Sequence, residues 1–95
     1  MIQIGPIRYE IDTAANLNGD DEEGLFGVCD YELQIIHLES NMRPDRAAVA
    51  KWHEVLHAID DVYCAGIGER GVGILATAIC QLFRDNPGEM WTGDK

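Results

Sequence analysis

The architecture of this chain is organised around residues 52–59, whose sequence is WHEVLHAI. These residues favour a helix, and side chains four apart in a helix project from one face. His53 and His57 therefore lie one turn apart, where both imidazoles can reach a single ion. Glu54 projects nearby, where its carboxylate can take a proton from a water on the metal. The spacing His-Glu-x-x-His thus predicts a catalytic zinc site.

Helical patterns surround this motif and follow it. Pro44 and Asp45 favour a helix start, because proline suits the first turn and an acidic side chain suits the positive end of the helix dipole. The buried stripe is predicted to contain Trp52, Val55, Leu56, Ile59, Val62 and Tyr63. Residues 65–68 end this helix, and a second is expected from about Glu69 to Asp85. Its predicted stripe consists of Val72, Leu75, Ala76, Ile79, Leu82 and Phe83.

The first part of the chain has strand patterns. Residues 7–11 alternate apolar and polar, and residues 25–29 and 33–38 suggest a hairpin joined at residues 30–32. Residues 16–24 have the composition of a loop, and their acidic run lacks the ligand spacing of an EF-hand, which argues against calcium. The predicted fold is α+β, a small three-stranded, mostly antiparallel sheet followed by two packed helices. The 33–38 strand is the expected edge.

Length and charge narrow the classes of function. The 95 residues form one domain, with a core expected between about residues 7 and 87 and a loose tail at 88–95. The net charge is −10, so we expect no binding to nucleic acid or to anionic membranes. No apolar stretch is long enough to cross a bilayer. Three cysteines without CxxC spacing, and no signal peptide, indicate reduced thiols in a cytoplasm.

A catalytic zinc generally takes three protein ligands, so the two histidines need a third. Glu69 is the favoured candidate, because it begins the second helix on the inward stripe and would face the His57 end of the first. Glu69 could instead be a first-turn glutamate that interacts with the helix dipole and solvent. Asp60, Asp61 and Cys64 are rival ligands. The motif itself can also arise by accident in a helix with two histidines that bind nothing.

A sheet, a His-Glu-x-x-His helix and a second helix, in this order, resemble the minimal gluzincins of the ImmA/IrrE sort, metallopeptidase-like proteins often encoded in phages and prophages. The matching segments are residues 52–59 and the LFRDNP sequence at residues 82–87. The resemblance implies a zincin-like core, His53 and His57 as ligands and Glu54 as general base or acid. It also implies a ligand glutamate on the second helix near Gly73, a position where this chain has no side chain.

Two functions follow as expectations. The first is a zinc-dependent metallopeptidase that hydrolyses peptide bonds of a peptide or protein substrate, with Glu54 as the general base. An extended substrate would add to an edge strand of the sheet. The second is a zinc-binding domain of weak or absent activity that acts as a protein-interaction module.

Overall fold

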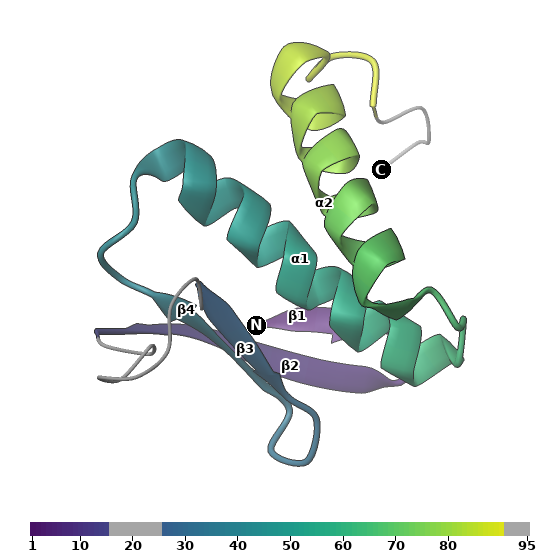
Figure 1. Cartoon of the computed structure of the whole chain (residues 1–95). Coiled ribbons are helices and arrows are strands. Elements are labelled where there is room, and N and C mark those ends of the chain that lie inside the picture. The colour runs from purple at the N-terminus through teal and green to yellow at the C-terminus, as the bar shows by residue number, and fades with distance from the viewer. Residues whose placement is uncertain (16–25, 91–95) are drawn as a thin grey trace.

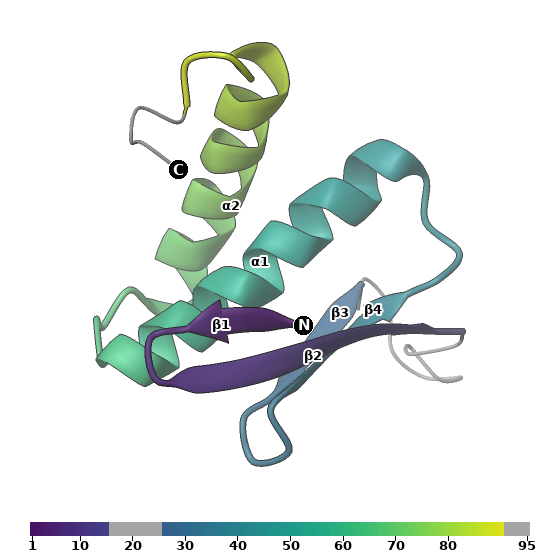
Figure 2. The same ribbon diagram turned by 180° about the vertical axis from the view of Figure 1, so that it is seen from behind.

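The computed structural model describes residues 1–15 and 26–90. This part contains the strands β1 (Ile2–Ile4), β2 (Ile7–Ala14), β3 (Gly27–Asp30) and β4 (Ile35–Glu39), and the helices α1 (Pro44–Tyr63) and α2 (Gly68–Asp85). The strands form one sheet in the order β1-β2-β4-β3. α1 lies against one face of this sheet, and α2 packs mainly on α1 and then diverges from it (Figures 1 and 2). The predicted α+β class is confirmed.

The predicted sheet has one strand too few. β1 was missed, because three residues are too few for a periodic pattern; it pairs with β2 across a tight turn in which Gly5 has a φ of 55°. Ile4 of this strand is only 6% exposed and belongs to the main hydrophobic cluster. The sheet is mixed and mostly antiparallel: β2 pairs with β4 in parallel, and the other two pairings are antiparallel.

The edge strand also differs from the prediction. β4 pairs with β2 on one side and with β3 on the other, so β3, not the 33–38 strand, lies at the edge of the described sheet. The reason is burial, because Ile36 and Leu38 make β4 the more apolar strand and favour its central place. β4 itself begins at Ile35. Leu33 belongs to the preceding turn, where its N–H donates to Asp30 Oδ1 at 2.9 Å.

The main core lies between the sheet and α1. Tyr9 and Ile36 are at most 1% exposed and come from neighbouring strands. Ala50 and Ala58 belong to the same cluster, and their small side chains let α1 approach the sheet closely. This packing fixes the rotation of α1, and hence the direction in which its polar residues point.

The contact between the two helices forms a second, smaller cluster. Its buried members are Leu56, Val72 and Ala76, and the rings of Trp52 and Phe83 lie 5.3 Å apart beside it. The predicted stripe of α2 is only half buried, because this helix has α1 as its main support. Among the residues predicted inward on the two helices, four remain 39–61% exposed: Tyr63, Leu75, Leu82 and Phe83.

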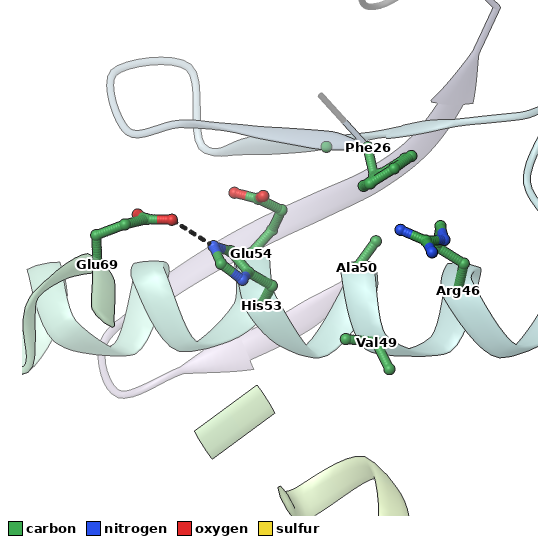
Figure 3. A pocket seen from close by; sticks show the side chains of 8 residues that line it. Phe26, Arg46, Val49, Ala50, His53, Glu54 and Glu69 are labelled. Carbon is green, nitrogen blue, oxygen red and sulfur yellow. Dashed lines mark hydrogen bonds and ion pairs between the residues drawn. The ribbon is translucent and has the colours of Figure 1, made fainter. Parts of the chain in front are cut away.

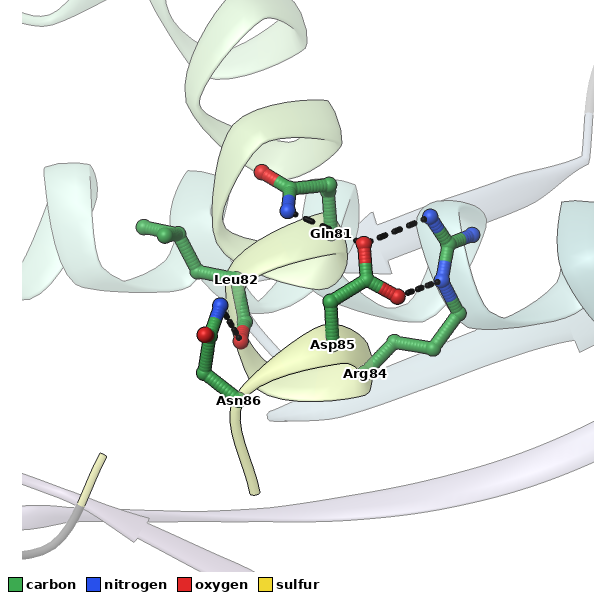
Figure 4. A network of polar contacts seen from close by, with 5 residues as sticks. All are labelled: Gln81, Leu82, Arg84, Asp85 and Asn86. Atoms are coloured by element: carbon green, nitrogen blue, oxygen red, sulfur yellow. Dashed lines mark hydrogen bonds and ion pairs between the residues drawn. The ribbon is translucent and has the colours of Figure 1, made fainter. Parts of the chain in front are cut away.

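α2 ends in a set of local polar contacts (Figure 4). The backbone N–H and the side-chain amide of Asn86 both donate to the Leu82 carbonyl, at 2.9 and 3.1 Å. Arg84 pairs with the neighbouring Asp85 at 3.0 Å. The two Asn86 hydrogen bonds satisfy the Leu82 carbonyl in the last turn of α2, where a helix end leaves carbonyl groups without helical partners.

Some predictions concern residues outside the described ranges. The acidic 16–24 loop, the Leu25 end of the 25–29 strand and the last five residues of the tail, 91–95, are among them. Neither of the two helices in the described ranges has the length and apolar character of a membrane span.

Candidate metal centre

The structure brings His53, His57 and Glu69 together. One candidate ligand atom from each side chain lies within 4.8 Å of the other two. The Glu69 carboxylate bridges the histidines, with Oε1 at 2.9 Å from His53 Nε2 and Oε2 at 2.6 Å from His57 Nε2. The imidazole rings lie one turn apart on α1, with centroids 4.9 Å apart and planes tilted by 60°. Three groups of the type that bind zinc therefore converge from two helices.

Asp60 places Glu69 in this position. Its carboxylate accepts hydrogen bonds from the N–H groups of Ile67 at 2.9 Å and Gly68 at 3.1 Å, which begin α2 directly before Glu69. These two N–H groups hold the pKa of the Asp60 carboxyl below its usual value of 3.8. Asp60 therefore acts as an anchor for the start of α2, which accounts for a residue that the sequence offered as a rival ligand.

Asp61 and Cys64, which the sequence also offered as rival ligands, lie outside the cluster. Both are exposed near the end of α1, and the Cys64 backbone is left-handed with a φ of 50°. His37 lies on β4, where its Nδ1 is 2.8 Å from Asp12 Oδ1, so this lone strand histidine serves hydrogen bonding. Gly73 faces the site, because a Cβ built there would lie 3.9 Å from His53 Cε1.

Glu54 lies beside this cluster and points between α1 and the edge strand β3 (Figure 3). The residue is 9% exposed, and this burial raises the pKa of its carboxyl. Coulombic interaction with His53 and His57 opposes the rise in the Glu54 pKa, and that with Glu69 adds to it. A carboxyl group shifted upward is a stronger base than a free glutamate, which suits proton transfer near neutral pH.

The donor set fits a zinc ion. Two imidazole nitrogens and one carboxylate, with a further position left for water, make the ligand set of many catalytic zinc sites. Two ligand atoms on one tetrahedral zinc are roughly 3.4 Å apart, slightly more than the histidine–carboxylate distances of 2.9 and 2.6 Å. The Glu69 side chain is 73% exposed, so it is free to move the small distance that an ion requires.

A cleft of about 260 Å³ opens beside the cluster. His53, Glu54 and Glu69 line one part of it, and Phe26 and Arg46 line another (Figure 3). The Arg46 guanidinium lies 4.8 Å from the centre of the Phe26 ring. Neither residue was identified from the sequence, although Arg46 precedes His53 by seven residues and so shares its helical face.

Gly27 is a further residue of the site that was not identified from the sequence. It lies at the start of β3, and a Cβ there would come within 2.8 Å of Glu54 Cγ and 3.1 Å of the His37 carbonyl oxygen. Only glycine leaves the space that the Glu54 side chain occupies. A glycine within a strand is a known sign of close approach, and this was the available signal.

Cys29 is close to Glu54 but does not add a reactive group. Burial, together with the charge of Glu54, raises the pKa of the Cys29 thiol to about 12. The thiol is therefore neutral, and all three cysteines are free.

Comparison with known proteins yields no matching family model, no matching curated protein and no matching solved structure.

Proposed function

We propose that this chain is a zinc-dependent metallopeptidase-like hydrolase of the gluzincin type. The observation that carries the proposal is the convergence of His53, His57 and Glu69 beside the buried carboxyl of Glu54. Two helices supply the ligands, so the site depends on the tertiary fold and not on the helical spacing alone. The free cysteines suit a reducing cytoplasm, which is the compartment we propose.

The chain's own residues have distinct roles in this chemistry. His53, His57 and Glu69 would hold a zinc ion, which when bound would supply polarisation of a peptide carbonyl and a more acidic water. Glu54 accepts a proton from the attacking water, whose oxygen bonds to the carbonyl carbon. When the carbon–nitrogen bond breaks, Glu54 returns that proton to the leaving amine. Burial raises the pKa of this carboxyl, which makes it a stronger base for the first transfer.

The substrate we propose is an extended segment of a peptide or protein. In the described sheet, β3 pairs only with β4, so its other edge is available to a strand. Backbone hydrogen bonds along such an edge hold a substrate in extended form. Gly27 on β3 lies directly opposite Glu54, which places the edge next to the proton-transferring group. We therefore propose that the substrate pairs with β3, and not with the 33–38 strand that the sequence led us to expect.

Metal content and one substitution test this proposal. We expect one zinc per chain in purified, zinc-supplied protein, measured by elemental analysis. Glu54→Gln should keep the zinc and the fold but lower peptide hydrolysis by about 10² or more, as loss of a general base does. Glu32→Gln removes an exposed carboxyl from the β3–β4 turn and is the matched control. A metal-free protein, or unchanged hydrolysis in Glu54→Gln, would disprove the proposed mechanism.

A second candidate function is a zinc-binding interaction module without turnover. It is favoured by the exposure of apolar side chains along α2, where Ile74 is 57% and Phe83 44% exposed. In this case the metal would hold α2 against α1 through Glu69. Stoichiometric zinc, loss of fold on metal removal and no hydrolysis by either wild type or Glu54→Gln would select this function.

A further inference from the structure

Arg46 gives the cleft a permanent positive charge, which metal chemistry does not require. It carries the only permanently positive side chain among the described residues that line the cleft. No ion pair between Arg46 and a carboxylate occurs within the described ranges, where its contact is with the Phe26 ring. In a chain with 17 acidic and 7 basic residues, a cation directed into the cleft is notable.

We propose that Arg46 recognises a carboxylate of the substrate, about three residues to the C-terminal side of the bond that is cleaved. This inference rests on the proposed function and specifies the substrate class of the same site. Arginine suits the role because its planar fork matches a carboxylate in two parallel hydrogen bonds.

The stacking on Phe26 prepares the guanidinium for binding. The 4.8 Å separation is within the range of a cation–π contact, which restricts the rotamers of the long side chain. A side chain already restricted loses less entropy when it binds a ligand. The planar group also keeps its edge nitrogens free for a carboxylate while its face contacts the ring.

The spacing follows from helix and strand geometry. Arg46 and His53 are seven residues apart on α1, which corresponds to about 10 Å along the helix axis. An extended peptide covers this distance in about three residues, at roughly 3.3 Å each. A carboxylate at that point can belong to an Asp or Glu side chain or to the C-terminus of the substrate.

The direction of the substrate follows from the direction of β3. Phe26, just before β3, contacts Arg46 near the start of α1, whereas Cys29, later in β3, interacts with Glu54 and Asp61 further along. β3 and α1 therefore run the same way, as Figure 1 also shows. A strand that pairs antiparallel with β3, the more stable pairing, directs its C-terminal half toward Arg46.

The net charge of the cleft with a divalent metal ion bound is consistent with an anionic ligand. A divalent ion balances the negative charges of Glu54 and Glu69, and an ion of this kind dominates the local field. Arg46 then leaves the cleft positive, although the chain as a whole is acidic. An acidic group is therefore favoured at the Arg46 end.

Matched peptides test the inference. We propose alanine- and serine-based peptides that carry a single Glu, or a single Gln, at each position in turn, with amidated C-termini. A second set has no acidic side chain and a free C-terminal carboxylate. Hydrolysis is measured with wild type, and product masses locate each cleaved bond. Binding of fluorescein-labelled peptides is measured separately with zinc-loaded Glu54→Gln, which does not depend on turnover.

Wild type should cleave Glu peptides about tenfold better than Gln peptides, mainly about three residues before the Glu, because a charge-assisted pair is gained. Arg46→Gln should bring this ratio close to one, and Arg46→Lys should keep part of it. Arg43→Gln removes the same charge outside the cleft lining and should keep the full ratio. A preference for the free C-terminus over its amide would identify the terminus as the carboxylate.

Three outcomes would overturn the inference: equal treatment of Glu and Gln peptides by wild type, an unchanged ratio in Arg46→Gln, or no binding of any peptide. Absence of hydrolysis alone would count against the proposed function and not against Arg46. In that case the Glu-to-Gln ratio of dissociation constants on zinc-loaded Glu54→Gln, with and without Arg46→Gln, still decides the point.

Discussion

The proposed role of Glu69 as third ligand is the part of the site most open to experiment, because one substitution should lower zinc affinity and a second should restore it. Glu69 bridges the two histidines at 2.9 and 2.6 Å. Residues that merely hydrogen-bond to a zinc ligand contribute about 10- to 100-fold in affinity. A direct ligand should exceed this, so Glu69→Gln should weaken zinc binding by about 100-fold or more, or about 3 kcal/mol.

Gly73→Glu in the Glu69→Gln background should restore much of that affinity. A Cβ at position 73 would lie 3.9 Å from His53 Cε1, an ordinary contact, and a glutamate there would carry its carboxylate toward the same imidazole. Replacing a helical glycine by a good helix former such as Glu or Gln also stabilises the helix by roughly 0.5–1 kcal/mol. Gly73→Gln in the same background provides the control, because it adds the helix stabilisation without the carboxylate.

The assay is competition for zinc with a chelating indicator near neutral pH, alongside thermal unfolding with and without zinc. Rescue by Gly73→Glu beyond Gly73→Gln would show that this face of α2 reaches the ion. If Glu69→Gln bound zinc as tightly as wild type, the assignment of Glu69 as the third ligand would be wrong. Equal affinity of the two double variants would refute the reasoning about position 73.

Two further substitutions probe the residues that support the site. Asp60→Ala should lower zinc affinity although Asp60 is no ligand, because the start of α2 loses its anchor, whereas Asp61→Ala should not. The pKa of Asp60 in the folded protein lies below its usual value of 3.8. Its contribution to stability is therefore complete above pH 3.8 and is lost as the pH falls through the folded pKa. In urea unfolding, the difference in free energy of unfolding between wild type and Asp60→Ala should shrink in acid. Gly27→Ala places a Cβ 2.8 Å from Glu54 Cγ and should destabilise the fold by about 1–3 kcal/mol. Gly27→Ala should lower the rate of hydrolysis by a larger factor than it lowers the zinc content. An unaffected turnover rate would contradict the steric argument.

Helical spacing alone determined which polar residues of α1 lie on the same face. Side chains at positions 53 and 57 must share a face in any α-helix, and the apolar stripe beside them directs that face toward the edge of the core. The short 65–68 link likewise predicted that α2 returns to α1, and so indicated Glu69. Local periodicity and capping were sufficient for these features because they depend on neighbours in the sequence.

Only the tertiary structure decided the order of the sheet and the shape of the cleft. β4 lies between β2 and β3 because it also pairs with β2, more than 20 residues earlier in the chain, and so buries Ile36 and Leu38. That order makes β3 the edge strand and brings Gly27 against Glu54 and Phe26 against Arg46. Contacts between residues about 20 or more positions apart depend on how whole elements pack, and packing is a property of the folded chain.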